Sequence, residues 1–260
     1  DGSFLKVNDH LARQLRRPGR AIEKLRFQDI TDPRDLQNNL QQVAQMIKGA
    51  IHGFSTEKRY MDQAGNPFWA LLNVSLLRGK NGQPQCMLSV VQDIDESKQR
   101  ERRLQSLAYH DQLTGVCNRA GFVEEAPILL QQAKGKLGYL AVFICDIIGL
   151  KRINGRYGHA AGDRAICAVA QQISQETAGR GLVARLGGDE FVAMVSCRSL
   201  SELSEITQTL QTPLQIPTLP HAVRISVGVA LAGEDSSTLT GLMAVADTRM
   251  FHNKRLDQLT

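Results

Sequence analysis

Apolar and polar positions divide the chain into a first part made of short strands and a second part in which helices and strands alternate. In the first part, apolar residues recur at every second position over three runs, which predicts half-buried strands. These runs cover residues 51–61, 68–77 and 86–94. Asn81-Gly82, between the last two runs, predicts a hairpin turn. We also expect a short strand at residues 4–7 and a helix at 36–47 before them.

From residue 111 onward, helical patterns of period 3.6 alternate with apolar runs. The run at 137–147 is almost entirely apolar, so we expect a strand that is buried on both faces. The expected elements are a helix at 119–133, this strand, a helix at 162–178, a hairpin of strands at 182–186 and 190–195, a helix near 200–210, a strand at 223–231 and a last helix that includes 239–250. The order strand, helix, strand, strand, helix, strand predicts a ferredoxin-like antiparallel sheet backed by helices, an α+β fold.

Charged residues crowd positions 96–110 between the two parts, and Leu104, Leu107 and Ala108 form the only apolar seam there. This pattern predicts a connecting helix, either one half of a short parallel coiled coil or a solvated linker. We therefore expect two domains, at 1–95 and 111–260, joined by a helix.

The composition narrows the class of protein. The 260 residues suffice for two domains that each have a core. Lys and Arg exceed Asp and Glu by 31 to 26, but this charge forms no basic stripe with interleaved aromatics, so we expect no nucleic-acid binding. The five cysteines include no C-x-x-C pair, which disfavours zinc or redox motifs and fits a reducing cytoplasmic setting.

No apolar stretch approaches the roughly 18 residues that a membrane span needs, so we expect no membrane contact from this segment. Its first residues, Asp-Gly-Ser-Phe, resemble the middle of a domain. We therefore expect a fragment, the cytoplasmic part of a protein whose other segments could include a membrane anchor.

The segment RLGGDEFVAMV at 185–195 carries the most informative chemistry. Gly187 and Gly188 between two apolar strands predict a tight turn whose backbone can approach a ligand. Asp189 and Glu190 follow at once and, on a strand, point to opposite faces, so one can face a metal while the other has another partner. Taken alone, the segment also fits a hairpin with a polar tip.

Further polar residues follow the predicted strand at 137–147. Asp146 ends this strand, where a lone carboxylate is most often a helix cap, but where a second carboxylate nearby would allow Mg²⁺ binding. Lys151 and main-chain N–H groups at a helix start can hold phosphates. Asn154 and Asp163 can read the edge of a purine by hydrogen bonds.

The first part resembles a PAS domain, a sheet-and-helix sensor fold, in the segments DGSFLKVND, EKRYMDQAGNPFWALLNVSLLRGKNGQP and VVQDIDESK. The resemblance covers about residues 1–95, and the first strand of that fold is missing. It does not name a ligand: His10 and His52 stand alone, and no reactive-cysteine motif of a flavin type is present. A ligand-bound sensor and an empty dimerisation module both fit.

The second part resembles the GGDEF family, the diguanylate cyclases, over about residues 108–258. Five segments occur in the order and spacing of that family: DQLTGVCNR, DIIGLKRINGRYGHAAGD, RLGGDEF, SVGVA and ADTRMFHNK. The resemblance implies condensation of two GTP molecules into cyclic di-GMP and pyrophosphate with Mg²⁺ or Mn²⁺. Because each domain would hold one GTP, it also implies a homodimer.

The resemblance also implies roles for individual residues. Asp146, Asp189 and the carbonyl of Ile147 would ligate the metal ion, and Asn154 and Asp163 would bind the guanine. Phosphates would meet Gly149, Leu150 and Lys151, with Lys254 reaching in from the last helix. Gly187 and Gly188 would let the hairpin lie against the nucleotide, while Glu190 would assist the metal site or the deprotonation of the ribose 3′-hydroxyl. Asp189, Glu190 and Lys151 form the implied catalytic set.

Several positions depart from the family pattern. Ile148 replaces a second acid, Leu150 a phenylalanine, Gly155 an aspartate and Gln258 an arginine. Ala178 and Gly181 stand where an R-x-x-D motif commonly binds the inhibitory product, and a methyl group cannot replace a bidentate Arg, so we predict that this inhibitory site is absent.

These observations leave three hypotheses. The first is an active cyclase regulated by its PAS domain, which the intact Asp146, Asp189 and Glu190 favour. The second is a weak or inactive GTP-binding module that regulates a neighbouring domain such as a cyclic di-GMP phosphodiesterase, which Ile148 and Gln258 favour. The third is a dimerising scaffold without activity.

Overall fold

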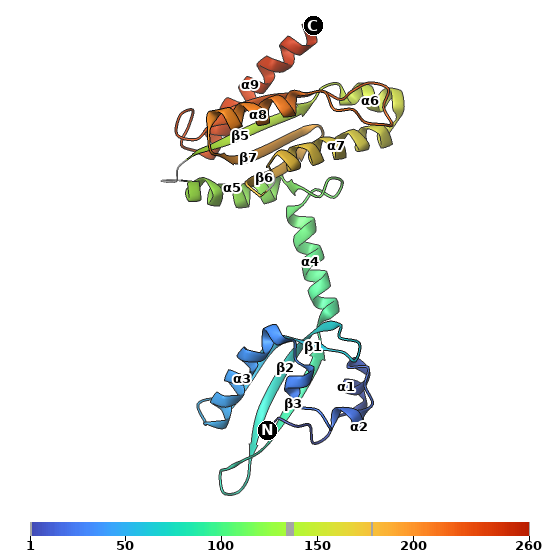
Figure 1. The fold of residues 1–260 in the computed structure, drawn as a ribbon, viewed down its shortest axis with the longest axis vertical. Helices are drawn as coiled ribbons and strands as arrows, with labels where there is room; N and C mark the ends of the chain where they lie inside the picture. The colour runs from blue at the N-terminus through green and yellow to red at the C-terminus, as the bar shows by residue number, and fades with distance from the viewer. Residues whose placement is uncertain (1, 134–137, 178, 260) are drawn as a thin grey trace. The chain divides into compact units, whose positions relative to one another are not determined.

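The chain forms two compact units, Asp1–Arg103 and Leu104–Thr260 (Figure 1). We call them the N-terminal unit and the C-terminal unit. The computed structural model describes residues 2–133, 138–177 and 179–259, and it describes side chains as far as residue 255. Among the described helices, none combines the length and the apolar character that a membrane crossing needs.

The N-terminal unit places helices before a three-stranded antiparallel sheet of order β1-β2-β3. The helices are α1 (Asp9–Gln14), α2 (Gly19–Ile22), the 3₁₀ helix η1 (Phe27–Ile30) and α3 (Pro33–Ile47), and the strands are β1 (Gly53–Met61), β2 (Pro67–Arg78) and β3 (Pro84–Asp93). The three predicted strands, the hairpin turn at Asn81-Gly82 and the helix at 36–47 are thus confirmed. Asp32 starts α3, because its side chain accepts a hydrogen bond from the Arg34 N–H at 2.9 Å.

The predicted strand at residues 4–7 is wrong. In this region only an isolated bridge forms, between Ser3 and Arg26. The Asn8 side chain accepts a hydrogen bond from the Leu11 N–H at 2.9 Å and starts α1. The chain therefore turns into a helix before a ladder can extend.

The inner face of the N-terminal sheet contains one charged residue among apolar ones. Lys58 on β1 is only 2% exposed, between an apolar cluster around Leu15 and Ile22 and a smaller one around Met46. Burial lowers the pKa of its ammonium group from 10.5 to about 7, and the negative charge of Asp35 opposes this shift.

The charge-rich segment after the sheet forms the predicted connecting helix. This helix, α4, runs from Asp95 to Tyr109, and Leu104 on it is 67% exposed. The coiled-coil and linker interpretations of this helix both stay predictions.

The C-terminal unit is an α+β fold around a five-stranded sheet of order β4-β6-β7-β5-β8. Its elements are β4 (Cys117–Asn118), α5 (Arg119–Ala133), β5 (Tyr139–Ile147), α6 (Leu150–Tyr157), α7 (His159–Thr177), β6 (Gly181–Gly187), β7 (Glu190–Cys197), α8 (Leu200–Gln211), β8 (Ile225–Leu231) and α9 (Leu239–Leu259). All neighbouring strands are antiparallel except β4 and β6. The predicted strand and helix order is confirmed, whereas β4 and α6 were not predicted, and residues 137 and 178 of the predicted elements lie outside the described residues.

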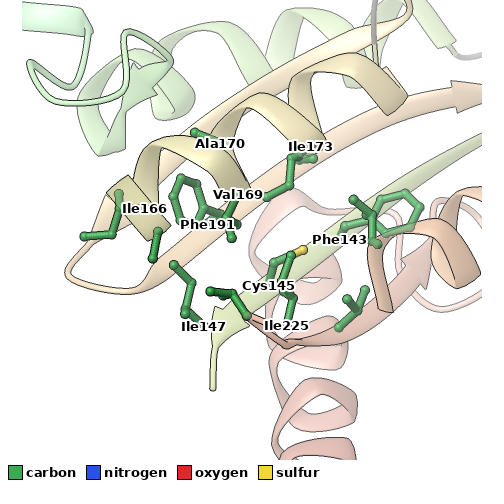
Figure 2. Packing of buried hydrophobic residues seen from close by; sticks show 14 of the residues in the cluster. Phe143, Cys145, Ile147, Ile166, Val169, Ala170, Ile173, Phe191 and Ile225 are labelled. Atoms are coloured by element: carbon green, nitrogen blue, oxygen red, sulfur yellow. The ribbon is translucent and has the colours of Figure 1, made fainter. Parts of the chain in front are cut away.

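Both faces of β5 are buried, as its apolar run predicts. Odd-numbered residues such as Phe143 and Cys145 face a cluster with α7 and α8 (Figure 2). Even-numbered residues such as Val142 and Ile144 face a second cluster that includes side chains of α5 and α9. Because side chains alternate along a strand, Asp146 belongs to the face that α9 covers.

The stability of the N-terminal unit should rise with pH because of Lys58. The pKa of Lys58 is about 7 in the folded chain and 10.5 ordinarily, so between these pH values the unfolded chain binds a proton that the folded chain lacks. The free energy of unfolding should increase by up to about 1.4 kcal/mol per pH unit in that window. Urea unfolding followed by the fluorescence of Trp69, the single tryptophan, measures this unit. Lys58→Met should remove the slope, and an equal slope in this variant would contradict the assignment.

Candidate active site

The end of β5 and the turn between β6 and β7 lie next to each other at one end of the strands of the C-terminal sheet. Asp146 is the last residue but one of β5, and it lies in register with Glu190 on β7 and Ser226 on β8. The Ile147 N–H donates to the carbonyl of Asp189 at 3.1 Å, which extends the pairing into the turn. Asp146, Ile147 and Asp189, the predicted metal residues, are therefore brought together.

Asp146 places a carboxylate where water hardly reaches it, since the residue is 5% exposed. Burial raises the pKa of this carboxyl above its usual range, and the nearby charge of Asp189 acts in the same direction. Lys254 lowers the pKa in turn, because its Nζ donates to Oδ1 of Asp146 at 2.6 Å. The net shift is upward, so Lys254 compensates the negative charge only in part.

The donor set at this edge fits a divalent cation. Two carboxylates and the carbonyl of Ile147 are oxygen ligands of the kind that Mg²⁺ and Mn²⁺ prefer. In the part of the chain that the structure describes, no three His, Cys, Asp or Glu side chains gather to hold a metal ion. An ion here would thus need main-chain and substrate oxygens beside Asp146 and Asp189.

The helix that carries Lys254 is fastened directly to β8. A Cβ atom at Gly228 would come within 2.0 Å of the Ala246 carbonyl oxygen, so the two backbones touch where a side chain would keep them apart. Three side chains tie the elements together: Ser226 donates to the carbonyl of Met250, Arg249 to that of Val229 and Asn253 to that of Val227. This attachment fixes the position from which Lys254 reaches Asp146.

The Gly-Gly turn is held by an arginine and an aspartate whose roles the sequence did not reveal. Gly187 and Gly188 have φ of +146° and +55°, which side chains rarely permit, and no atom lies within 4 Å of a Cβ built on either. The turn is thus open to a ligand. Arg185 donates to the carbonyl of Gly188 at 2.7 Å and to both carboxylate oxygens of Asp111 at 3.2 Å.

The start of α6 offers free main-chain donors. Gly149 precedes the helix with φ of +76°, and no side chain caps this end. The first N–H groups of a helix can therefore bind an anion, which the helix dipole also favours. Leu150 is buried and contributes only its backbone, while the side chain of Lys151 is exposed.

The side-chain amide of Asn154 on α6 has an oxygen that accepts no hydrogen bond. Its Oδ1 is buried and makes no hydrogen bond. Gly162 on α7 leaves room for this side chain, since a Cβ there would lie 1.8 Å from Oδ1. Asp163, the next residue, is exposed. An amide that can turn away from Gly162 and an exposed carboxylate on the facing helix suit a ligand edge that carries N–H groups.

The C-terminal unit matches a known protein family. The family model described as diguanylate cyclase, GGDEF domain, matches residues 108–258, more than half of the chain. The chain belongs to the GGDEF family. Its C-terminal unit is therefore a GGDEF unit, and the five motifs of the sequence lie within the matched residues.

Two relatives from Pseudomonas aeruginosa show how much of a longer protein this GGDEF unit resembles. The bifunctional diguanylate cyclase/cyclic di-GMP phosphodiesterase MucR is 36% identical over 159 residues, which are 59% of this chain and 23% of MucR. The diguanylate cyclase TpbB of strain UCBPP-PA14 is 33% identical over 175 residues, 62% of this chain and 40% of TpbB. The chain thus spans less than half the length of each.

Solved structures agree with the GGDEF fold. A sensory box/GGDEF family protein from Caulobacter crescentus is 29% identical and superposes with a TM-score of 0.51. The match covers 57% of this chain and 99% of that chain. The GGDEF domain of TpbB is 33% identical, with the same TM-score of 0.51, and covers 57% of this chain and 90% of that chain.

The remaining residues of the GGDEF unit that the sequence singled out differ in their surroundings. Glu190 is exposed although it is opposite Asp146 in the ladder. Gly181 starts β6, where a Cβ atom would come within 2.2 Å of the Met194 carbonyl oxygen, so the backbone at this position leaves no room for an acidic side chain. Ala178 and the side chain of Gln258 lie outside the described residues, and the absence of an inhibitory site stays a prediction.

Alanine at two glycines of the GGDEF unit should have opposite effects on its stability. Gly228→Ala should lower the free energy of unfolding by about 1–3 kcal/mol or more, because the new methyl group meets the backbone of α9. Gly155→Ala within α6 meets no atom within 4 Å and should raise it by about 0.5–1 kcal/mol. Urea unfolding monitored by circular dichroism tests both variants. Equal effects would show that α9 does not rest on β8 as described.

Proposed function

We propose that the GGDEF unit condenses two GTP molecules into cyclic di-GMP and pyrophosphate. The observation that carries this proposal is the junction of Asp146, Asp189 and Lys254 at the end of β5. Two carboxylates and one ammonium group there supply the charges that a metal-bound triphosphate needs. The name of TpbB, a diguanylate cyclase that is 33% identical to this chain, supports the same reaction.

In this proposal, separate groups of residues bind the guanine, the phosphates and the metal ion. Asn154 and Asp163 bind the guanine, and Gly149, Leu150 and Lys151 hold the phosphates with the first N–H groups of α6. Asp146, Asp189 and the carbonyl of Ile147 would hold Mg²⁺ or Mn²⁺, whose charge would stabilise the negative charge that develops on the phosphate. Gly187 and Gly188 let the turn lie along the nucleotide.

Each of the two condensation steps is an in-line displacement. The 3′-oxygen of one GTP forms a bond to the α-phosphorus of the other, and the bond from that phosphorus to the bridging oxygen breaks, so that pyrophosphate leaves. Glu190, which is exposed beside Asp189, either takes the proton of the 3′-hydroxyl or supports the metal site. Lys254, whose Nζ lies 2.6 Å from Oδ1 of Asp146, would place a positive charge next to the phosphates.

Because one unit holds one GTP, catalysis requires two units that face each other, and we propose a homodimer. We further propose that the N-terminal unit is a PAS sensor at 1–95 and that the helix at 96–110 regulates the encounter of the GGDEF units at 111–260. Their control would act through proximity and orientation of the two substrates. Since GTP is an intracellular substrate, the proposed reaction would take place in the cytoplasm.

A second candidate function follows from position 148. Ile148 is half-buried and stands where the family pattern has a second acid, so this end of the sheet has one acidic residue fewer than that pattern. The unit would then bind GTP without turnover and regulate another domain. The name of the relative MucR gives it both diguanylate cyclase and cyclic di-GMP phosphodiesterase activity, so a protein similar to this chain combines the two activities.

Asp189→Ala should separate the two functions. The full chain, incubated with Mg²⁺ and GTP, should form cyclic di-GMP, and the variant should lose about three orders of magnitude in rate, because several kcal/mol of charge stabilisation are lost at about 1.4 kcal/mol per tenfold. Glu234→Ala removes an exposed carboxylate elsewhere and serves as the matched control, with an unchanged rate. GTP binding without product in the unmodified chain would favour the regulatory function, and neither binding nor product would contradict both.

Asn154→Ala should weaken nucleotide selection. We expect the affinity for 3′-deoxy-GTP, which cannot react, to fall by about 10- to 100-fold, because the variant lacks the amide that would hydrogen-bond the guanine. The preference over the inosine analogue, which lacks the 2-amino group, should shrink as well. Isothermal titration calorimetry with Gln171→Ala, an exposed residue of α7, as the control measures both. An unchanged preference would remove Asn154 from the base site.

A further inference from the structure

Lys58 of the N-terminal unit has no counterion. Its Nζ donates to Oγ1 of Thr31 at 2.9 Å and to Oδ1 of Asn39 at 2.8 Å, and both acceptors are neutral. Among the described residues, no ion pair includes Lys58, so no carboxylate oxygen of theirs lies within 4.0 Å of Nζ. With a side chain that is 2% exposed, the ammonium group cannot turn to water either. One of its three N–H donors is left without a hydrogen-bonded acceptor.

Asn39 adds a second unused donor beside it. Asn39 is also 2% exposed, and because its Oδ1 accepts from Lys58, the other amide atom is the nitrogen. This Nδ2 is buried and has no hydrogen-bond partner. A buried donor without an acceptor costs about 1–3 kcal/mol, so a partner that accepts from both Lys58 and Asn39 would be bound with a substantial gain.

Two carboxylates at the start of α3 already have partners. Asp32 pairs with Arg34 at 2.7 Å, and Asp35 pairs with Arg59 at 2.8 Å. The acidic and basic groups around α3 therefore balance one another and leave Lys58 as the uncompensated charge. Its pKa of about 7, which burial causes and which the charge of Asp35 only partly offsets, is consistent with this.

Aromatic rings complete the surroundings of the ammonium group. Nζ lies 4.3 Å from the ring centre of Tyr60 and 5.5 Å from that of Phe27. The rings stabilise a cation but cannot accept the proton of the Asn39 amide in a regular hydrogen bond. They offer an apolar surface to whatever accepts it.

We propose that Lys58 and Asn39 bind the carboxylate of a small organic acid inside the N-terminal unit. One carboxylate oxygen accepts from the ammonium group and the other from the amide nitrogen, and the apolar body of the acid packs on the rings of Phe27 and Tyr60. A single negative charge neutralises Lys58. Phosphate as a dianion would add a second charge close to Asp35, with no cation left to meet it. The proposal is independent of the cyclase reaction.

Binding of propionate to the full chain tests this site, with propionamide as the neutral ligand of the same shape. Saturation-transfer NMR detects weak binding, and urea unfolding followed by Trp69 fluorescence reports on this unit alone. Measured below the pKa of about 7, where Lys58 is charged, propionate should bind and raise the unfolding midpoint, and propionamide should do neither. Among the described residues, two other ionisable groups act on the Lys58 ammonium group: the carboxylate of Asp35 on α3 and the ring of Tyr60 on β1.

Two variants make the test specific. Lys58→Met should lower the propionate affinity at least about tenfold, while Lys24→Met, which removes an exposed charge of the same unit, should leave it unchanged. Asn39→Asp places a carboxylate beside Lys58 within the chain, so it should raise the unfolding midpoint without ligand and abolish the response to propionate. Equal responses of the unmodified chain, Lys58→Met and Asn39→Asp would overturn the proposal. So would an equal effect of propionamide, or a response to inorganic phosphate alone.

Discussion

Asp146 carries a carboxylate at the end of a strand that is covered on both faces, where water cannot solvate the charge. Because β5 is buried, the carboxylate of Asp146 at its end is poorly solvated and is stabilised by a nearby positive charge. Lys254 supplies this charge from α9, and it can do so because Gly228 lets that helix lie directly on β8. The contact between Lys254 and Asp146 thus depends on how closely the backbones of α9 and β8 approach each other.

The N-terminal unit presents the opposite case, a buried cation without an anion. Lys58 and Asp146 are both nearly inaccessible, and the fold offers each of them hydrogen bonds but incomplete charge compensation. Buried charges that are only partly compensated reduce stability, and a ligand that completes them gains the difference as binding energy. We interpret Lys58 as part of a binding site for an organic anion and Asp146 as part of a binding site for a divalent cation.

Much of the architecture was predictable from local patterns. The apolar run of β5 and the helical spacing of Ile166, Val169 and Ile173 in α7 locate these elements to within a few residues, because burial on two faces and on one face leave distinct patterns. The strand expected at 4–7 failed because pairing depends on distant partners, and α6 was missed because eight residues hardly establish a period. The buried position of Lys58 was hidden by its charge, since a polar residue in a strand normally predicts a solvated face.

The candidate site residues were named from the sequence, whereas their contacts were not. Asp146 and Asp189 were named from sequence and do meet, whereas the pairing of Arg185 with Asp111 and the tie of Asn253 to β8 lie between segments distant in sequence. The most direct test of the proposed metal site is the affinity of Mn²⁺ for the full chain with 3′-deoxy-GTP, measured by electron paramagnetic resonance. We predict that Asp146→Asn weakens Mn²⁺ binding by at least about tenfold, as the loss of one charged ligand requires. An equal affinity in both proteins would contradict the account.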